Sequence, residues 1–274
     1  MKAALYSPSR RTGAGYDPAI TPLAPAATSV AVAGDWGGQI QWARKVVREV
    51  AGARLRTIVH LGDLGVLMPG RLGNRFTINL EQNLEENDVR LVLVDGNHDA
   101  HPRLRRAPFE PASGFRRLGA RLWWTGRGTS WSWAGRRLGA LGGAYSVDRA
   151  RLTEGFNLWS LLEEPTEEEA ERLRSERLDV LFSHDAPAGV PLTSWLRLRP
   201  AALARANRTR ELLDGVVAQT QPAVLFHGHW HQAGVHWLSA GTKTTAYSLA
   251  NEWSPENVRI LDLSTLEVRD LPTV

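Results

Sequence analysis

Short apolar runs alternate with amphipathic stretches along the first part of the chain. Residues 29–33 form an apolar run, residues 39–50 carry one apolar face at helical spacing, and residues 57–61 are apolar again. A helical pattern over residues 76–86 then leads to residues 89–94, a short, continuous and β-branched run. Such runs are typical of strands that are buried on both faces. The pattern therefore predicts strand, helix, strand, helix and strand in that order.

The remainder of the chain returns to this alternation after an interruption. Residues 122–125, 129–133 and 136–141 are strand-like runs separated by glycines, which indicates a meander of antiparallel strands. Thr166 and Glu169 form a capping-box pattern, which predicts a helix that continues to about residue 177. The later elements that we expect are strands at residues 180–183 and 223–226, a helix at residues 201–219, and a terminal pair of strands. An α/β fold of two packed sheets with helices outside accounts for this order.

The chain is long enough for a full hydrophobic core without cross-links. At 274 residues, folding removes roughly 75% of the extended chain's surface from water. We expect one domain over residues 29–274, preceded by a flexible N-terminal arm over residues 1–28 that lacks the apolar core of a signal peptide. Because no window approaches the roughly 18 apolar residues of a membrane span, we expect a cytoplasmic protein with no membrane partner.

The composition limits the chemistry that the protein can perform. The sequence has no cysteine, which excludes disulfide frameworks, zinc ribbons, iron–sulfur ligation and thiol nucleophiles. Of the 33 basic residues, all but Lys2, Lys45 and Lys243 are arginine, and the net charge is +4. Arginine grips phosphate bidentately, although a general compositional bias explains the same skew. The charge alone therefore does not indicate a nucleic-acid partner.

Each predicted core strand ends beside a side chain that can bind a metal ion. These strand exits carry Gly34-Asp35, Gly62-Asp63, Gly96-Asn97-His98-Asp99, His184-Asp185 and His229-Trp230-His231. Taken alone, each is as consistent with an ordinary turn, but the carboxyl ends of strands in open α/β sheets meet at one crevice. Two divalent ions held about 3.5 to 4 Å apart by carboxylate, imidazole and amide oxygen acidify a water molecule and hydrolyse phosphate esters. The pattern thus indicates a dinuclear site.

These motifs, in this order, resemble those of the calcineurin-like metallophosphoesterase superfamily over most of the chain, from about Val30 to Leu263. The resemblance implies a four-layer αββα sandwich of two mixed sheets flanked by helices. It also implies that a metal-bound hydroxide attacks the phosphorus in line, while His98 stabilises negative charge or protonates the leaving oxygen. The metal ligands that it implies are Asp35 on the first ion, Asp63 as the bridge, Asn97, His184 and His229 on the second ion, and His231 on the first ion.

The first motif departs from the family's usual Asp-x-His. Its third place is Gly37, so the first ion has one imidazole fewer than usual. The sequence Gly-Asp-Trp-Gly-Gly resembles the first motif of the purple acid phosphatase branch. In the second motif, however, Val66 stands where that branch has a tyrosine, so the motif does not support a ferric charge-transfer site. Three outcomes are open: water molecules complete the coordination shell of the first ion, Gln39 completes it, or the first ion binds weakly. The donors suit manganese best among manganese, iron and zinc.

Substrate selection depends on segments that the metal motifs leave open. Tyr145, Asp148 and Arg149 are candidates for contacting the substrate, together with Arg151 and residues 156–159. We expect a phosphate ester substrate, either a monoester or a diester. Two alternatives remain: a nuclease or nucleic-acid end-processing phosphatase that uses the arginines and the arm, and a non-catalytic metal-binding module permitted by Gly37. Nucleotides and nucleic acid are both possible partners, and the oligomeric state is open.

Several further polar and aromatic residues are expected to be structural. We predict that His60 is a hydrogen-bonded core residue, that His227 lies in the core or orients a ligand, and that His101 and His236 are on the surface. Asp99 and Asp185, each next to a proposed ligand, either orient that ligand or stabilise a turn. Strand alternation predicts that one of Trp123 and Trp124 points outward.

Overall fold

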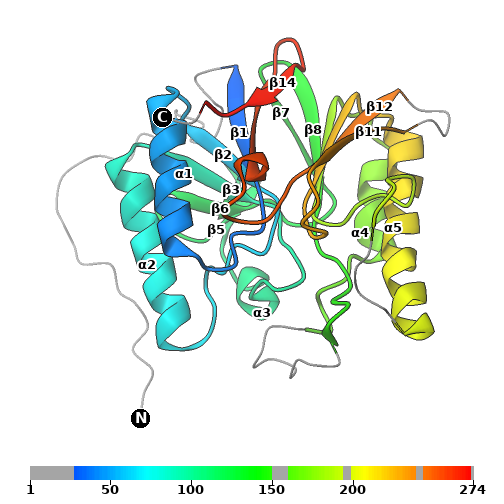
Figure 1. The fold of residues 1–274 in the computed structure, drawn as a ribbon, viewed down its shortest axis with the longest axis horizontal. Coiled ribbons are helices and arrows are strands. Elements are labelled where there is room, and N and C mark those ends of the chain that lie inside the picture. The colour runs from blue at the N-terminus through cyan, green and yellow to red at the C-terminus, as the bar shows by residue number, and fades with distance from the viewer. Residues whose placement is uncertain (1–27, 150–159, 194–198, 239–242, 273–274) are drawn as a thin grey trace.

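The computed structural model describes residues 28–149, 160–193, 199–238 and 243–272, and it consists of two packed β-sheets with helices on their outer faces (Figure 1). The eight-stranded sheet contains, in spatial order, β14 (Val268–Asp270), β13 (Val258–Asp262), β1 (Ser29–Ala33), β2 (Thr57–His60), β3 (Arg90–Leu93), β6 (Leu122–Trp124), β5 (Phe115–Arg117) and β4 (Phe109–Glu110). The six-stranded sheet contains β11 (Gly234–Leu238), β12 (Thr244–Ser248), β10 (Val224–His227), β9 (Val180–Ser183), β8 (Arg136–Leu141) and β7 (Thr129–Trp133).

The helices form the two outer layers. They are α1 (Ile40–Gly52) and α2 (Gly70–Glu86) beside the eight-stranded sheet, α4 (Glu167–Arg174) and α5 (Pro200–Thr220) beside the six-stranded sheet, and the short α3 (His101–Leu104) (Figure 1). This is the predicted four-layer αββα arrangement, and the α/β fold class is confirmed. Among the described residues, no helix combines the length and the apolar character that crossing a bilayer requires.

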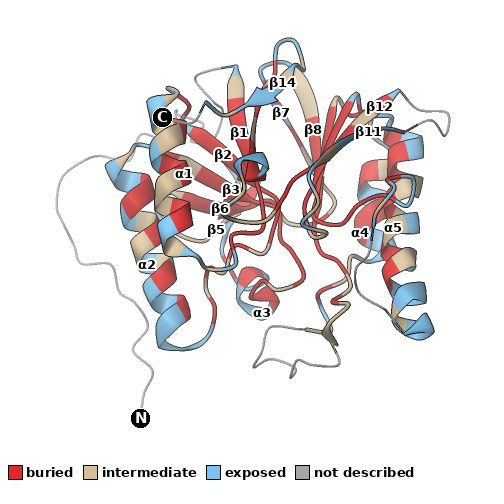
Figure 2. Cartoon of the chain, viewed as in Figure 1, coloured by how far each residue is buried: buried red, intermediate tan, exposed pale blue. Residues whose placement is uncertain are grey.

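The parallel strands place their carboxyl ends together. β1, β2, β3 and β6 run parallel in one sheet, as do β8, β9, β10 and β12 in the other, and antiparallel strands complete both sheets. β2, β9 and β10 are buried along their whole length because each lies between a helix layer and the opposite sheet. This explains why their sequences are continuous apolar runs, and Figure 2 shows the buried interior between the layers.

The middle of the chain differs from the prediction. β7 and β8 pair antiparallel as expected, but β6 pairs parallel with β3 in the other sheet, so the three runs are not one meander. Trp123 and Trp124 are both buried, and the expectation that one points outward is wrong. The reason is that β6 has a covered face on each side: Trp123 packs between the sheets, and Trp124 packs beneath the helices.

Local sequence signals determine the start of α4. The hydroxyl of Thr166 accepts a hydrogen bond from the backbone N–H of Glu169 at 3.2 Å, and the Glu169 carboxylate accepts one from the backbone N–H of Thr166 at 3.0 Å. The predicted capping box is therefore confirmed, although the helix ends at Arg174 rather than near residue 177. The same carboxylate accepts a hydrogen bond from Arg105 at 3.1 Å, which ties α4 to the segment after α3.

Candidate metal centre

Four of the six predicted metal ligands occupy a strained backbone conformation. Asp35, Asp63, His229 and His231 have φ angles of 52°, 53°, 64° and 54°. Residues other than glycine adopt this left-handed region infrequently, and it costs energy that the surrounding structure must offset. Such strained residues cluster at functional sites, and here they follow β1, β2 and β10.

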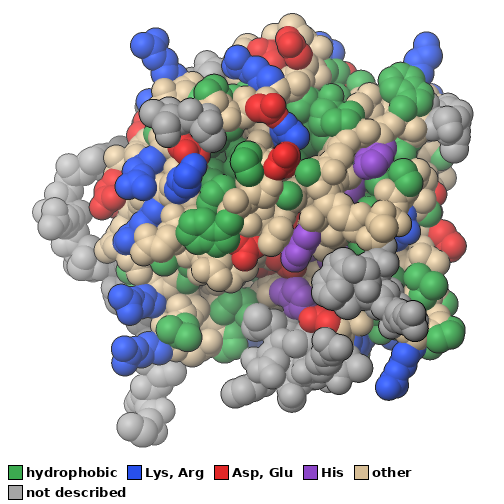
Figure 3. Space-filling view, viewed as in Figure 1, with side chains coloured by type: hydrophobic (Ala, Val, Ile, Leu, Met, Phe, Trp, Pro, Cys, Tyr) green, Lys and Arg blue, Asp and Glu red, His purple; other side chains and the backbone are tan. Residues whose placement is uncertain are grey.

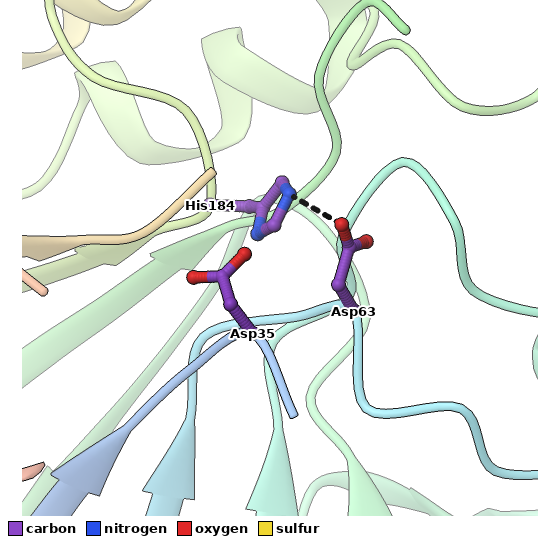
Figure 4. A group of neighbouring side chains, drawn as sticks. All are labelled: Asp35, Asp63 and His184. Atoms are coloured by element: carbon purple, nitrogen blue, oxygen red, sulfur yellow. Dashed lines mark ion pairs between the residues drawn. The ribbon is translucent and has the colours of Figure 1, made fainter. Parts of the chain in front are cut away.

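The exits of β1, β2 and β9 place three potential ligands together (Figure 4). Ligand atoms of Asp35, Asp63 and His184 all lie within 4.8 Å of one another, and all three residues are buried. Nε2 of His184 is 3.6 Å from Oδ2 of Asp63 and 2.9 Å from Oδ1 of Asn97. In this arrangement an imidazole nitrogen and two oxygen atoms face a common point.

The other nitrogen of His184 determines which tautomer the ring adopts. Nδ1 lies 2.6 Å from the carbonyl oxygen of Leu61, which can only accept a hydrogen bond, so Nδ1 carries the proton. Nε2 of the neutral ring then presents its lone pair to the cluster. A backbone carbonyl that orients a histidine in this way is a common feature of metal sites.

His229 and His231 bring the β10 exit to the same cluster. Nε2 of His231 is 3.6 Å from Oδ1 of Asp35, and the backbone N–H of His229 donates to Oδ2 of Asp35 at 3.1 Å. The His229 ring lies 5.0 Å from that of His184. The structure therefore brings the six sequence-predicted ligands into one continuous group of contacts. Figure 3 shows histidine and acidic side chains at the surface near the middle of the molecule.

The charges in this cluster perturb one another. Burial alone raises the pKa of Asp63, but His184 and His98 outweigh burial and lower it to about 2. Burial lowers the pKa of His184, yet Asp63 and Asp35 raise it above its ordinary value overall. The hydrogen bond from His231 to Asp35 raises the pKa of His231, whereas burial and His184 depress that of His229. The Asp63 carboxylate thus remains ionised and attracts positive charge to this point.

Two glycines leave room for the carboxylates. A Cβ atom on Gly96 would lie 2.2 Å from Oδ1 of Asp63, and one on Gly228 would lie 2.1 Å from Oδ2 of Asp35. Atoms do not approach this closely without displacement. Glycine is therefore required before Asn97 and before His229, because any larger residue would collide with a carboxylate of the cluster.

Asp99 fixes the loops that carry Asp63 and Asn97. Its carboxylate accepts hydrogen bonds from the backbone N–H groups of Gly96 at 2.8 Å, Asp63 at 3.0 Å and Leu64 at 3.1 Å. These donors lie on the exits of β2 and β3, which Asp99 joins. Asp99 thus orients a proposed ligand and stabilises a turn at the same time.

Asp185 fixes the His229-Trp230-His231 loop. Its Oδ1 accepts a hydrogen bond from Nε1 of Trp230 at 2.7 Å, and the guanidinium of Arg210 lies 5.6 Å from the Trp230 ring. Burial raises the pKa of Asp185 to about 6. The indole between the two histidines is held from both sides, which restricts the loop.

Asn257 holds the β1 exit, and the sequence analysis missed it. Its side chain is fully buried, donates to the carbonyl oxygens of Gly34 and Ala250, and accepts from Nε1 of Trp36 at 3.0 Å. These bonds fix the backbone on both sides of Asp35. Asn257 follows a proline and a glutamate in a polar turn, a context that gave no signal of this role.

His98 contacts one of the proposed substrate residues, and the other two have different partners. The backbone N–H of His98 donates to Oδ1 of Asp63 at 2.8 Å, and its partly exposed ring has Nε2 3.9 Å from Oδ1 of Asp148. Arg205 of α5 lies over the Tyr145 ring, with 5.5 Å between the guanidinium carbon and the ring centroid. A guanidinium nitrogen of Arg149 is 3.8 Å from Oε1 of Glu163. Arg151 and residues 156–159 lie outside the described residues.

Gln39 and the remaining histidines have varied surroundings. Gln39 is exposed at the N-cap of α1. His60 is buried as predicted and accepts a hydrogen bond at Nδ1 from the N–H of Gly62, but its Nε2 has no partner among the described residues. The ring nitrogens of the buried His227 face the Ser248 hydroxyl and the Gly228 carbonyl rather than a proposed ligand.

The prediction that His101 lies on the surface is wrong. His101 is 1% exposed, with Nε2 3.2 Å from the carbonyl oxygen of Asn97 and Nδ1 3.4 Å from Asp95. The buried Arg127 donates to Asp95 at 2.7 Å and to the carbonyl oxygen of Glu163 at 2.9 Å. The charge of Arg127, together with His101, holds the pKa of the buried Asp95 well below its usual range. His236 is half-buried.

Comparisons with known proteins agree with this geometry. The family model for calcineurin-like phosphoesterases matches residues 28–233, whereas no curated protein matches the sequence. The chain is similar to a dimetal phosphatase from Danio rerio, with a TM-score of 0.58 and 14% identity, covering 87% of this chain and 93% of that chain. It is also similar to the protein TT1561 of Thermus thermophilus, with a TM-score of 0.55 and 12% identity, covering 89% of this chain and 99% of that chain.

At these identities the two solved structures support the fold alone. The family match covers most of the chain and includes all six residues of the cluster. The chain therefore belongs to the calcineurin-like phosphoesterase family and is a hydrolase that acts on phosphoric ester bonds.

Proposed function

We propose that this protein hydrolyses a phosphate monoester or diester at a dinuclear centre that holds manganese in preference to iron or zinc. The observation that carries the proposal is the convergence of His184 Nε2, Asp63 Oδ2 and Asn97 Oδ1. These nitrogen and oxygen donors fit a divalent cation, and Asp35 supplies a second carboxylate at the same point. Two bound divalent cations would activate a water molecule and neutralise charge on the phosphoryl oxygens.

The six residues divide between the two ions. Asp63 lies between the two groups and would bridge them, since it contacts His184 and lies within reach of Asp35. Asn97, His184 and His229 would hold one ion. Asp35 and His231, which are 3.6 Å apart, would hold the other.

The ion beside Asp35 has fewer protein ligands. Gly37, in the place of the usual histidine, is exposed and has a φ of 52°. Its two chain neighbours aside, no atom of the described residues lies within 4 Å of where its Cβ would be. Gly37 itself supplies no ligand atom from a side chain. Water or Gln39 would complete this coordination shell, and we expect this ion to bind more weakly than its partner.

His98 is the proposed general acid. Its backbone N–H is fixed by Asp63, while its ring is partly exposed beside the cluster and faces Asp148. This position allows the ring to donate a proton to the leaving oxygen or to stabilise negative charge on the phosphoryl group. Asp148, which lies beside this ring, together with Tyr145 and Arg149, would contact the leaving group.

Activity measurements on matched esters test the proposal. Nitrophenyl monoester and diester hydrolysis is measured with manganese, iron or zinc, alongside elemental analysis of metal per chain. Asp63→Asn should lower turnover by a factor on the order of 100 or more, because it removes the bridging charge. Asp88→Asn is the matched control, since Asp88 is exposed, pairs with Arg121, and precedes the amino end of β3, whereas Asn97 follows the carboxyl end of that strand. Absence of turnover by the wild-type protein with all three metals would favour a non-catalytic metal-binding module instead.

A further inference from the structure

The two polar atoms of the Asn97 side chain face different partners. Oδ1 lies 2.9 Å from Nε2 of His184 and points to the metal cluster, and Nδ2 donates to Oγ of Ser146 at 2.9 Å. An amide that rotates by half a turn exchanges these two atoms, so that two N–H groups would face the cluster. Because an N–H group repels a cation, only one of the two orientations allows Asn97 to bind a metal.

Ser146 is itself held by a buried carboxylate. Its hydroxyl donates to Oε2 of Glu163 at 2.8 Å, and its backbone N–H donates to Oε1 at 3.1 Å. Ser146 and Glu163 are both fully buried. The backbone N–H of Ser160 and the guanidinium of Arg149 also approach this carboxylate, so its neighbours are hydrogen-bond donors or positive charge. Burial raises the pKa of Glu163 overall, although the Ser146 hydrogen bonds and Arg149 act in the opposite direction. Because hydrogen-bond donors meet both carboxylate oxygens, Glu163 acts as the acceptor toward Ser146.

Asn97, Ser146 and Glu163 are linked by successive hydrogen bonds, and the direction of one bond determines the direction of the next. Glu163 accepts, so the single hydroxyl proton of Ser146 is directed to Glu163. The Ser146 oxygen can then only accept from Asn97, and the only donor on the Asn97 side chain is Nδ2. Oδ1 is left to face His184 and the cluster.

We propose that Glu163 is a positioning residue that acts through Ser146 to hold the Asn97 amide with its oxygen toward the metal. This inference rests on the proposed role of Asn97 as a ligand. Neither Ser146 nor Glu163 touches the reacting atoms. Their effect is to remove the competing orientation of the amide, which would place positive hydrogens where the cation binds.

Glu163→Gln is the variant that tests this direction. Glutamine has nearly the same shape, but its amide group can donate to the Ser146 oxygen. The Ser146 proton is then free to bond to Oδ1 of Asn97, which stabilises the wrong orientation of that amide. We expect the affinity for manganese at one of the two sites to fall by about 10- to 100-fold, the usual effect of changing a residue that orients a ligand.

Glu164→Gln is the matched control. Glu164 is the next residue and has Oε1 2.8 Å from a guanidinium nitrogen of Arg205 and 3.9 Å from one of Arg149, but it does not bond to Ser146 in the described structure. Manganese binding to metal-free protein is measured by calorimetry for wild type and both variants. The visible spectrum of the cobalt-loaded proteins reports the change of ligand independently, and thermal melting of the metal-free proteins shows that each is folded.

Ser146→Ala provides a second route if Glu163→Gln does not fold. It removes the acceptor for Nδ2 and should also weaken manganese at one site. Where Glu163→Gln folds, this variant decides: selective weakening, with Glu164→Gln like wild type, supports the inference. Ser146→Ala decides in the same way only where Glu163→Gln does not fold. Unchanged affinity and spectrum of the deciding variant, while wild type binds two ions, overturn the inference and leave the proposed function intact. A wild-type protein that binds no manganese overturns both.

Discussion

The proposed metal ligands are held by backbone geometry as much as by side-chain contacts. Asp35, Asp63, His229 and His231 all have positive φ angles, and the tight turns that carry them are joined by hydrogen bonds to Asp99 and Asn257. The cost of each left-handed residue, about 1 kcal/mol or more, is offset by these surrounding bonds. Because bonds within the chain hold these turns, little further ordering is needed for the donors to bind a cation.

Gly96→Ala should disrupt this arrangement by steric overlap alone. Alanine causes no backbone strain at this position, since the φ of Gly96 is not positive. The added methyl group would meet Oδ1 of Asp63 at 2.2 Å and displace this carboxylate, the proposed bridge. We expect metal affinity to fall by about 10-fold or more, as measured by elemental analysis after dialysis. Gly52→Ala at the end of α1 is the control, because its Cβ meets nothing within 4 Å. Equal metal content in the two variants would contradict the role assigned to Gly96.

His60 should make the metal-free protein sensitive to acid. Burial, with a smaller contribution from His184, lowers its pKa from 6.5 to about 3. As pH falls, the unfolded chain binds the proton first, so stability present above pH 6.5 is lost progressively down to about pH 3. His227 has a similar lowered pKa and contributes in the same direction.

His60→Asn keeps an acceptor for the N–H of Gly62 but does not titrate. We expect the slope of the unfolding free energy between about pH 6 and pH 4 to decrease by up to one proton, about 1.4 kcal/mol per pH unit. Urea unfolding of the metal-free protein at several pH values in this window measures the slope. A slope identical to that of wild type would show that His60 is protonated in the folded protein.

At the scale of elements, the predictable features were those that a single segment determines. Strands that are covered on both faces have continuous apolar sequences. The core strands, and the proposed ligands at their exits, were therefore found from the sequence. The partner of β6 could not be found in this way, because strand pairing depends on contacts between distant segments. The short strands β4 and β5 were missed because two or three residues carry no readable periodicity.

The positioning residues were missed or left open for the same reason. Asn257 and Glu163 act on groups that lie far away in the sequence or across a loop, and nothing in their immediate neighbours distinguishes them from surface residues. His101 was wrongly predicted to lie on the surface. The left-handed φ angles of the aspartates and histidines are likewise imposed by tertiary bonds. Glycine signals such a turn in a sequence, whereas Asp63 or His229 does not.

The capping box of α4 gives a prediction at this scale. Thr166→Ala removes the acceptor for the N–H of Glu169 and should lower the free energy of unfolding by about 1 kcal/mol. Thr166→Ser retains the acceptor and should stay close to wild type. Urea unfolding monitored by circular dichroism compares the two, and equal losses would show that the hydroxyl does not stabilise the helix.

For the whole molecule, ion pairs within the fold explain part of the arginine-rich composition. Arginines bond to acidic groups within the fold at Arg117–Glu110, Arg127–Asp95, Arg136–Asp179 and Arg137–Glu176. These side chains join strands and loops within the sandwich, and their charges are already compensated. The net charge of +4 is thus a weak attraction for a polyanion.

The salt dependence of substrate binding distinguishes a small ester from nucleic acid. A substrate with one phosphate contact should bind about threefold more weakly when salt rises from about 50 to 200 mM. A nucleic-acid substrate held through six to ten phosphates should weaken by roughly 10³- to 10⁵-fold over the same range. Measurements of KM across this range test our expectation of the smaller change, and a steep dependence would favour the nuclease alternative.

The hydrogen bonds of Asn257 beside Asp35 also bear on the order in which the protein folds during translation. The carbonyl oxygen of Gly34 receives its hydrogen bond from a side chain 223 positions later, and β13, which begins at the next residue, pairs with β1. The turn at Asp35 is therefore locked only after the segment that carries Asn257 and β13 has been translated.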